Sequence, residues 1–491
     1  MGAAAEGGGA GVGPTLEEVR KTFRSGKTRE ESWRRSQLKA LMCLLQDREH
    51  DLVTALKQDL GKPHVESFKD EIGPLLKSVD FALANLNTWM SGIKAKLPLA
   101  AFPVKAEIIP EPLGVVLIFS SWNFPIGLSL EPMIGAIAAG CVGVLKPSEQ
   151  APACSSLLAE LIPAYLDPNA FKVIEGGALV SEVLLDHKWD KIFFTGSVHV
   201  GRAVMTAAAK HLTPVTLELG GKCPAVVDSL SRSWDKDVAL NRIIAGKFGV
   251  CSGQACIGID YILVEKKFCN ELVELMKKYM KQQFGQNQKE MQQSLARIVN
   301  KKHFLRLKIL LDEAQVKSSL VYGGLLDEEN LFIGPTLVVD PPLDSAVMTE
   351  EIFGPILPII TMERIEDSIE FFNSRPKPLT IYAFTHNESL MNMLASQTSS
   401  GSLVFNDAII QYAADTLPFG GVGESGIGRY HGKFSFDTFS HEKTVAKRSF
   451  LIDFWFRYPP WNPHKLQLLK AGYRFDYLSF VLILLGLKKT Y

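Results

Sequence analysis

The chain has no excess of charge of either sign. Its 53 Lys and Arg side chains are balanced by 53 Asp and Glu side chains over 491 residues, so it lacks the basic character typical of nucleic-acid binding. It has no apolar N-terminal segment of the secretory type, and its seven cysteines are odd in number and lack metal-ligand spacing. These absences predict a reducing, cytoplasmic compartment, free thiols and no metal site.

A fixed-period repeat is also absent, which excludes solenoids and propellers. The length exceeds what one hydrophobic core organises and indicates about three domains. Residues 1–13 are rich in Gly and Ala and are expected to form a mobile tail, since they offer little apolar surface to offset the entropy of ordering. Gly2 does not predict myristoylation, because Glu6 stands where Ser or Thr is required.

The patterns that are present are typical of an α/β protein. Residues 15–60 predict amphipathic helices, with Leu38, Leu41, Leu44 and Leu45 on one face. Short apolar runs follow, separated by helix-length stretches, which indicates βαβ units around a parallel sheet buried on both faces. The expected strands of this first series are 106–109, 114–119, 142–145, 171–174, 191–195 and 224–227. A second α/β series begins near Asp228, with expected strands at 261–264, 359–362, 381–385 and 402–405.

Two motifs in the middle of the chain carry reactive groups. One is Cys251-Ser252-Gly253-Gln254-Ala255-Cys256, and the other, upstream, is Thr216-Leu217-Glu218-Leu219-Gly220-Gly221-Lys222. Cysteine is a strong nucleophile near neutral pH because part of it is already thiolate, and an electropositive site raises that fraction. A carboxylate can then act as general base in a second, hydrolytic step. A single cysteine is otherwise more typical of a small buried apolar residue.

These two motifs resemble the aldehyde dehydrogenase superfamily, which has its nucleophile in Gly-Gln-x-Cys and its base in Glu-Leu-Gly-Gly-Lys. The resemblance assigns these roles to Cys256 and Glu218. Residues 417–433, 435–441 and 260–263 resemble class 3 (family 3) members more closely, and the resemblance runs from about Leu16 to Ser449. It implies the aldehyde dehydrogenase fold, with a Rossmann-like parallel-sheet cofactor domain, an α/β catalytic domain and a small bridging region. The expected parts are 14–93 and 114–219 for NAD binding, 220–404 for catalysis, 94–113 and 405–449 for bridging, and 450–491 as a C-terminal tail.

The expected cofactor loop is Phe193-Phe194-Thr195-Gly196-Ser197-Val198-His199-Val200-Gly201-Arg202. It reads as a strand, a short loop and a helix over 202–212, which would place backbone N–H groups near a pyrophosphate. The spacing is Gly-x-x-x-x-Gly, so the three-glycine Rossmann fingerprint is absent and an ordinary glycine turn fits equally well. The resemblance assigns Gly196, Ser197 and Gly201 to cofactor binding.

Two further segments are assigned to the cofactor by resemblance. Lys146 and Glu149 of Lys-Pro-Ser-Glu follow an apolar strand and would hold the adenosine ribose, whereas a solvated turn with an incidental charge pair is the alternative. Because Glu149 would repel a 2′-phosphate, NAD is favoured, and Lys146 keeps NADP open. In Glu-x-Phe-Gly-Pro, Glu351 would hold the nicotinamide ribose and Phe353 would pack beside the ring.

The segment Ser121-Trp122-Asn123-Phe124-Pro125 places an amide in a rigid aromatic turn. A fixed amide donor suits an oxyanion hole, where one donor lowers the barrier by roughly 3 kcal/mol. Alone, Asn123 would be a turn former, but the resemblance assigns it to the oxyanion hole together with the backbone N–H of Cys256. Cys251 is interpreted as structural, with a resolving thiol as the minority alternative.

The resemblance implies NAD(P)-dependent oxidation of medium- and long-chain aliphatic or aromatic aldehydes to carboxylic acids through a thiohemiacetal and a thioester. Two alternatives on the same fold remain: a catalytically silent structural protein and a coenzyme A-acylating dehydrogenase. Glu218 counts against both. The resemblance also implies a homodimer.

The end of the chain is aromatic and apolar. An eleven-residue run, 477–487, makes a helix of roughly 16 Å, which is too short to span a hydrocarbon core of about 30 Å. It suits contact with one leaflet, with Trp455 and Trp461 at the interface. Lys488 and Lys489 resemble a dilysine signal of the endoplasmic reticulum. A helix packed on a dimer partner is the alternative.

Overall fold

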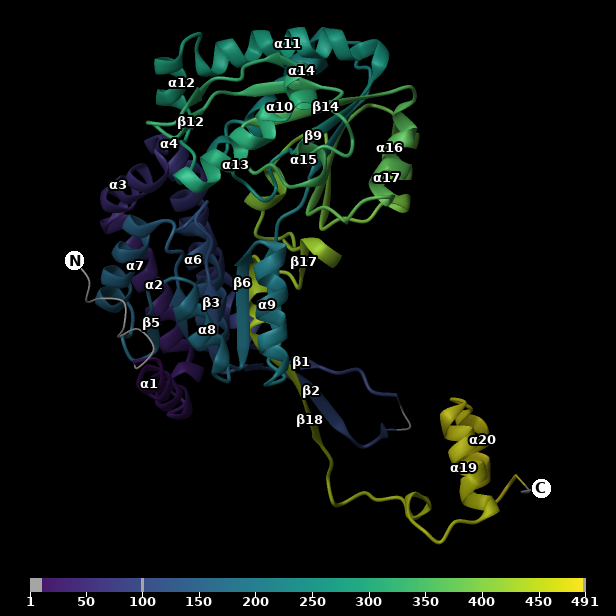
Figure 1. Ribbon diagram of the computed structural model, residues 1–491. Coiled ribbons are helices and arrows are strands. Elements are labelled where there is room, and N and C mark those ends of the chain that lie inside the picture. The colour runs from purple at the N-terminus through teal and green to yellow at the C-terminus, as the bar shows by residue number, and fades with distance from the viewer. Residues whose placement is uncertain (1–10, 99–100, 489–491) are drawn as a thin grey trace. The chain divides into compact units, whose positions relative to one another are not determined.

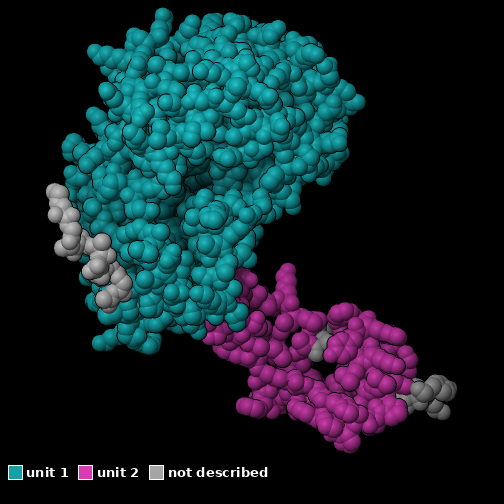
Figure 2. Space-filling model, viewed as in Figure 1, with its two compact units in different colours: residues 1–86, 112–439 teal, residues 87–111, 440–491 magenta. Residues whose placement is uncertain are grey.

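A computed structural model describes residues 11–98 and 101–488 (Figure 1). The expected features at Gly2, Glu6 and Lys489 lie outside the described residues. The chain divides into two compact units, coloured separately in Figure 2: residues 1–86 with 112–439, and residues 87–111 with 440–491. Both expected series of α/β strands belong to the first unit, apart from one strand described below.

The first sheet of the larger unit has six strands in the order β17-β7-β6-β3-β4-β5. Its strands are β3 (Val115–Phe119), β4 (Val142–Lys146), β5 (Phe171–Val173), β6 (Lys191–Gly196), β7 (Val215–Leu219) and β17 (Gly426–Ile427). All pairings are parallel except β17 with β7. Every residue of β3 and β4 is buried, which confirms the expected sheet covered on both faces.

Helices cover this sheet. They are α1 (Val12–Arg24), α2 (Glu31–Asp47), α3 (Glu49–Leu60), α6 (Gly127–Ala139), α7 (Pro152–Tyr165), α8 (Ala178–Asp186), α9 (Val198–Ala209) and α18 (Gly432–Thr438). Helix α6 packs on β3 and β4, and α9 packs on β6 and β7 (Figure 1). The four leucines of the predicted face in 15–60 are fully buried in α2. The predicted tail to residue 13 is too long, because α1 begins at Val12, which is buried together with Leu16 and so offsets the cost of ordering.

The second sheet has seven strands in the order β10-β13-β14-β9-β8-β15-β16. Its strands are β8 (Pro224–Val227), β9 (Tyr261–Glu265), β10 (Leu320–Tyr322), β13 (Thr336–Val339), β14 (Ile356–Met362), β15 (Thr380–Phe384) and β16 (Ser402–Phe405), and a separate hairpin joins β11 (Leu326–Asp327) to β12 (Phe332–Ile333). The four expected strands of the second series are confirmed. The run 224–227, expected in the first series, lies in this sheet between β9 and β15.

The helices associated with the second sheet are α10 (Ser233–Lys247), α11 (Lys266–Phe284), α12 (Gln288–Ser294), α13 (Lys301–Asp312), α14 (Ala314–Ser318), α15 (Ala346–Thr349), α16 (Ser368–Asn373) and α17 (Glu388–Gln397). Helix α11 packs on β9 and β14. Between α3 and the first sheet the chain forms α4 (His64–Ser67), the π-helical turn η2 (Phe68–Ile72) and α5 (Gly73–Met90).

The smaller unit contains a three-stranded sheet in the order β1 (Ile93–Lys94), β2 (Lys105–Pro112) and β18 (Ser440–Lys447), in which β1 and β2 pair antiparallel. The run 106–109 was expected in the parallel series and belongs here instead, since its residues are only half-buried and pair with the short strand β1. After β18 come the 3-10 turn η8 (Trp455–Arg457), α19 (Pro463–Tyr473) and α20 (Tyr477–Leu484). Phe456, Leu468, Ala471 and Ile483 form a small apolar cluster.

Candidate active site

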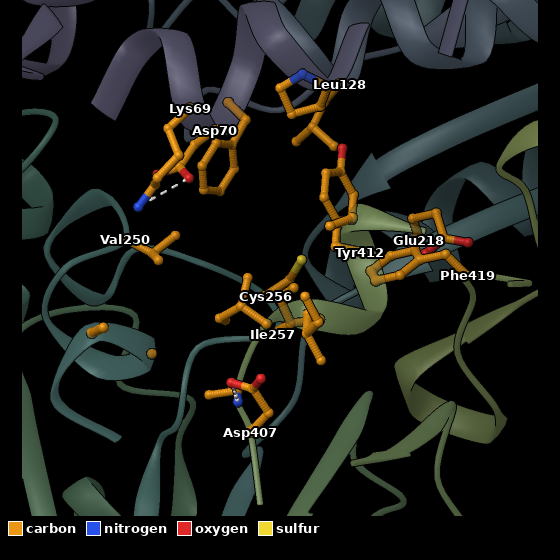
Figure 3. A pocket seen from close by; sticks show the side chains of 18 of the residues that line it. Lys69, Asp70, Leu128, Glu218, Val250, Cys256, Ile257, Asp407, Tyr412 and Phe419 are labelled. Atoms are coloured by element: carbon orange, nitrogen blue, oxygen red, sulfur yellow. Dashed lines mark hydrogen bonds and ion pairs between the residues drawn. The ribbon is translucent and has the colours of Figure 1, made fainter. Parts of the chain in front are cut away.

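A cavity of about 330 Å³ in the larger unit contains both Cys256 and Glu218. Most of its wall is apolar or aromatic, and the aromatic residues are Phe124, Tyr412, Phe419 and Tyr430. In Figure 3 the Cys256 sulfur points into the open space bounded by Leu128, Tyr412 and the ion-paired Lys69 and Asp70. The structure therefore brings together the two groups that the sequence assigned to nucleophile and base.

A tight turn presents Cys256. The 3-10 turn η4 (Cys251–Gly253) has left-handed backbone at Cys251 and Ser252, with φ of 48° and 51°. Gly253 has φ of 78°, and a Cβ there would come within 2.5 Å of the Gly354 carbonyl oxygen. The Gln254 side chain donates to the carbonyls of Cys251 (2.9 Å) and Arg297 (3.0 Å) and accepts from the N–H of Val299 (3.1 Å). The loop is thus fixed on several sides.

The electrostatic surroundings of Cys256 oppose ionisation. Burial, followed by the nearby carboxylates of Glu351 and Glu218, raises the pKa of the Cys256 thiol to about 12, and backbone N–H groups at residues 256 and 257 lower it only in part. Burial is the largest cause, because it disfavours the charged thiolate, and the two carboxyl groups act in the same direction.

Glu218 lies on β7, where it is paired with Gly426 of β17. Its side chain is only 4% exposed, and among the described residues neither carboxylate oxygen has a hydrogen-bond partner. Burial raises the pKa of Glu218 well above its ordinary value of 4.5. A carboxyl group that is buried, lacks a hydrogen-bond partner and lines a cavity has the properties of a general base or acid rather than of a structural ion pair.

Asn123 is buried beside the cysteine loop. The side-chain Nδ2 of Asn123 donates to the backbone carbonyl oxygen of Gln254 at 3.0 Å. The backbone carbonyl oxygen of Asn123 accepts from the Lys62 ammonium at 2.8 Å. An amide NH₂ carries two hydrogens, so the bond to Gln254 leaves one for a substrate oxygen. The structure thus ties Asn123 to the loop two residues before the nucleophile.

The expected cofactor loop starts its helix earlier than predicted. Helix α9 begins at Val198 instead of residue 202, because Ser197 acts as the N-cap and its hydroxyl accepts from the N–H of Val200. Gly201 therefore lies within the first turn, where a Cβ would come within 2.7 Å of the Leu219 side chain. At Gly196 a Cβ would meet the Phe194 ring at 2.6 Å. Close packing therefore favours glycine at both positions, whether or not either glycine contacts a ligand.

Lys146 and Glu149 form an ion pair of 2.6 Å at the carboxyl end of β4. The Lys146 side chain is 5% exposed and that of Glu149 is 47% exposed. Among the described residues, neither one lines the cavity of Cys256. The ion pair thus has one buried member, Lys146, and one half-exposed member, Glu149, at the carboxyl end of a strand of the first sheet.

Glu351 accepts a hydrogen bond from the N–H of Gly221 at 2.9 Å, and burial raises its pKa to about 7. Glu351, Gly220 and Val198 line a second cavity of about 390 Å³, so this acid and the beginning of α9 face one space. Phe353 has left-handed backbone (φ 51°) and packs edge-to-face on Trp122, with centroids 5.3 Å apart. A cavity with a carboxylate and a helix N-terminus fits a ribose and a phosphate, so these residues suit a dinucleotide.

A sequence profile of the aldehyde dehydrogenase family matches residues 1–445. The chain belongs to the aldehyde dehydrogenase family. Aldehyde dehydrogenase family 3 member F1 of Arabidopsis thaliana is 53% identical over 478 residues, which cover 97% of this chain and 99% of that protein. A Rattus norvegicus aldehyde dehydrogenase described as dimeric and NADP-preferring is 42% identical over 93% of this chain and 99% of its own length. The substrate-bound structure of Staphylococcus aureus AldH gives a TM-score of 0.89 at 39% identity, over 96% of this chain and 99% of that one.

These matches confirm the aldehyde dehydrogenase fold and the assignment to family 3. They support NAD(P)-dependent oxidation of aldehydes as the activity of this aldehyde dehydrogenase, and they give no support to a silent structural protein or a coenzyme A-acylating enzyme. Within residues 11–98 and 101–488, no cluster of His, Cys, Asp and Glu is arranged to hold a metal ion.

Sequence reasoning missed one set of residues at this aldehyde dehydrogenase site. Lys62, Glu66 and Glu71 are buried under the cavity and contact the backbone of the Asn123 turn and of the cysteine loop. They lie in a short charged stretch that has the pattern of a solvated helix. No local signal distinguishes them, because their partners are far away in the sequence.

Proposed function

We propose that Cys256, Glu218 and Asn123 carry out aldehyde oxidation as nucleophile, general base and oxyanion donor. The observation that supports this most strongly is the unpartnered, buried carboxyl group of Glu218 in the same cavity as the Cys256 thiol. A buried titratable group without a hydrogen-bond partner is costly, and such groups are typical of sites where chemistry uses them. The tight turn at 251–253 supports a fixed direction of attack.

In this mechanism the Cys256 thiol gives its proton to solvent water, and the resulting thiolate adds to the aldehyde carbon. The Asn123 amide and the N–H of Cys256 stabilise the oxygen that becomes negative. When bound, the oxidised nicotinamide supplies a positive charge and accepts the hydride. The resulting thioester on Cys256 is hydrolysed by a water molecule, from which Glu218 removes a proton, and the carboxylic acid leaves.

We propose medium- and long-chain aliphatic or aromatic aldehydes as substrates. The support comes from the cavity wall, in which Phe124, Leu128, Ile257 and Phe419 present apolar surface around the nucleophile. An apolar substrate tail gains free energy there by leaving water, at roughly 25 cal/mol per Å² of buried area.

NAD is proposed as the preferred cofactor, through Lys146, Glu149, Gly196, Ser197, Gly201, Glu351 and Phe353. Glu149 is half exposed and accepts hydrogen bonds from ribose hydroxyls, whereas it repels a 2′-phosphate. Lys146 acts in the opposite direction, and the rat relative described as NADP-preferring keeps NADP as the second candidate. The Lys146–Glu149 ion pair reduces the attraction of Lys146 for a phosphate, which favours NAD.

One assay tests the reaction and the cofactor together. The purified chain is expected to reduce NAD in the presence of a medium-chain aldehyde at the same rate with and without coenzyme A, because Glu218 activates water for thioester hydrolysis. NADP in place of NAD is expected to give a lower kcat/KM. A strict need for coenzyme A would replace the hydrolytic mechanism with acyl transfer, and equal efficiency with NADP would show that Lys146 outweighs Glu149.

We further propose a homodimer and the division into parts given by the sequence: 14–93 and 114–219 for cofactor, 220–404 for catalysis, 94–113 and 405–449 for bridging. The three-stranded sheet of β1, β2 and β18 supports the bridging region, because it is a separate sheet whose outer strands β1 and β18 are largely exposed and so accessible to a second copy. The rat relative is described as dimeric.

For the tail, 450–491, we propose contact with the surface of a membrane, on the cytosolic face of the endoplasmic reticulum. Large apolar side chains are exposed here, namely Phe450, Leu451, Trp455, Trp461, Phe475, Leu478, Leu485 and Leu487. Helix α20 ends at Leu484, because Gly486 turns into left-handed backbone (φ 72°), so it is shorter than the run predicted from sequence. Among residues 11–98 and 101–488, no helix is both long and apolar enough to cross a bilayer.

The tail is expected to bring the full chain to the top of a density gradient with anionic liposomes, while a version that ends at Ser449 stays at the bottom. Two tails in a dimer would strengthen the attachment by raising the effective concentration of the second tail. Flotation that survives high salt indicates apolar insertion, and loss at high salt indicates attraction through charge. If the full-length, active chain remains in the aqueous fraction at low salt, the proposed membrane contact is wrong and the tail packs on protein instead.

A further inference from the structure

We propose that Lys62, Glu66 and Glu71 are positioning residues, which together form a buried brace that holds Asn123 and the Cys256 loop at a fixed separation. The inference rests on the proposed function of Cys256 and Asn123. It concerns residues that do not touch the reacting atoms and whose effect is transmitted through the backbone.

Lys62 and Glu71 form the first half of the brace and bind the turn that carries Asn123. Lys62 and Glu71 are both fully buried and form an ion pair of 2.6 Å. Lys62 Nζ also donates to the carbonyl of Asn123 at 2.8 Å. The second Glu71 oxygen accepts from the N–H groups of Ile126 (2.9 Å) and Gly127 (3.0 Å). The turn is therefore held at its beginning by a cation and at its end by an anion.

Further contacts hold the Lys62 ammonium in place. Its ammonium lies 4.1 Å from the centre of the Phe124 ring, a cation–π distance, and Phe124 lines the substrate cavity. Burial by itself would lower the pKa of Lys62, but Glu71, followed by other nearby acidic groups, outweighs it and raises the pKa. Lys62 therefore stays charged over the working pH range.

Glu66 forms the second half of the brace and binds the cysteine loop. Glu66 Oε1 accepts from the N–H of Cys251 at 2.7 Å, at the residue where η4 begins. Asn123 Nδ2 donates to the Gln254 carbonyl at 3.0 Å, which links the two gripped segments directly. Glu66 and Glu71 are five residues apart, Glu66 on α4 and Glu71 on the π-helical turn η2 that follows it. One short segment thus holds both the oxyanion donor and the nucleophile loop.

Physical considerations favour a positioning role over a stabilising one. A buried ion pair usually gives little net stability compared with apolar residues of similar size, because both charges lose their hydration. It does impose a direction and a distance on every group it contacts. Attack on a carbonyl depends on such geometry, since a misplacement of about 1 Å costs on the order of 100-fold in rate.

The decisive experiment measures single-turnover hydride transfer in a Lys62→Met variant of the full-length chain. We expect the rate of NADH formation in the first turnover to fall about 100-fold, with the Kd for NAD and the rate of Cys256 alkylation by iodoacetamide within about threefold of the unmodified chain. Alkylation forms no oxyanion, so it reports on access to the thiol without the help of Asn123. A first-turnover rate within threefold of the unmodified chain would overturn the brace.

A double-mutant comparison separates positioning from general destabilisation. In the Asn123→Ala background the same Lys62→Met change is expected to cost less than threefold, because the donor through which Lys62 acts has been removed. A structural defect would cost the same factor in both backgrounds, and that outcome would overturn the proposal.

Two further variants keep the test valid if Lys62→Met alone fails to fold. Lys62→Met with Glu71→Gln removes both charges and keeps an acceptor for Ile126 and Gly127, so it is expected to fold and to remain slow; a rate equal to that of the unmodified chain would overturn the brace. Lys236→Met is the control, because Lys236 also has a 2.6 Å ion pair, with Glu271, and lies 5.3 Å from the Phe268 ring. It is expected to keep the rate. If the unmodified chain forms no NADH, the proposed function fails, whereas fast Lys62 variants overturn only the brace.

Discussion

Replacement of Cys256 by alanine is expected to abolish aldehyde oxidation, lowering kcat by at least about 10⁴-fold. The alanine variant has no atom that can form the thiohemiacetal, and no other side chain in the cavity has comparable nucleophilicity at neutral pH. The loss should appear in kcat alone. Binding of NAD, measured by titration calorimetry, and the melting temperature should stay close to those of the unmodified chain, since the side chain is small and only partly buried.

Cys251→Ala is the matched control for this experiment, because it removes a thiol from the same loop. The Cys251 sulfur is fully buried, its pKa is raised by burial, and its one long contact is from Gln254 Nε2 at 3.7 Å. Activity should therefore be retained. Activity within tenfold of the unmodified chain in Cys256→Ala would rule out the covalent mechanism, and a loss in Cys251→Ala would give that thiol a chemical role.

The second large effect is expected from Glu218→Gln. If Glu218 acts after hydride transfer, the variant should release one equivalent of NADH per active site in a fast burst and then turn over about 100- to 1000-fold more slowly. Stopped-flow absorbance of NADH measures both phases. Glutamine keeps the size and polarity of the side chain, so the comparison isolates the loss of a group that accepts a proton.

The pKa of Glu218 gives this prediction a pH signature. Since burial raises that pKa above its ordinary range, the carboxylate form becomes more populated as the pH increases towards the raised value. Thioester hydrolysis by the unmodified chain should therefore accelerate with pH, and the acceleration should be absent from the variant. Glu363→Gln, at an exposed ion pair with Lys266, is the control and should leave both phases unchanged. Disappearance of the burst would mean that Glu218 also takes the proton from Cys256.

The proposed reactive groups could be predicted from sequence because each lies in a short motif with a chemical meaning. Glu218 precedes two glycines and Cys256 follows Gly253 and Gln254, and the cavity contains both. The raised pKa of the thiol could not be predicted, since it depends first on burial and then on Glu351, which is close only in the folded chain. Lys62 escaped prediction for the same reason: its partner carbonyl on Asn123 is 61 residues away.

Errors in the predicted elements have local physical causes. Helix α9 was expected to begin at residue 202, since glycine was weighted as the helix opener, whereas the hydroxyl of Ser197 caps it four residues earlier. The strand β13 was missed, and its four residues lie directly between Pro335 and Asp340. The run 106–109 has the apolar character of a parallel strand, and only its pairing with β1 identifies it as part of a hairpin.

The pairing of Gly426 with Glu218 has a consequence during synthesis of the protein. β7 is complete once residue 219 has left the ribosome, but β17, which lies along its free edge, is made more than two hundred residues later. Until then this edge of β7 has no β17 to pair with. Completing the six-stranded sheet beside Glu218 therefore requires a contact between two segments that are far apart in the sequence.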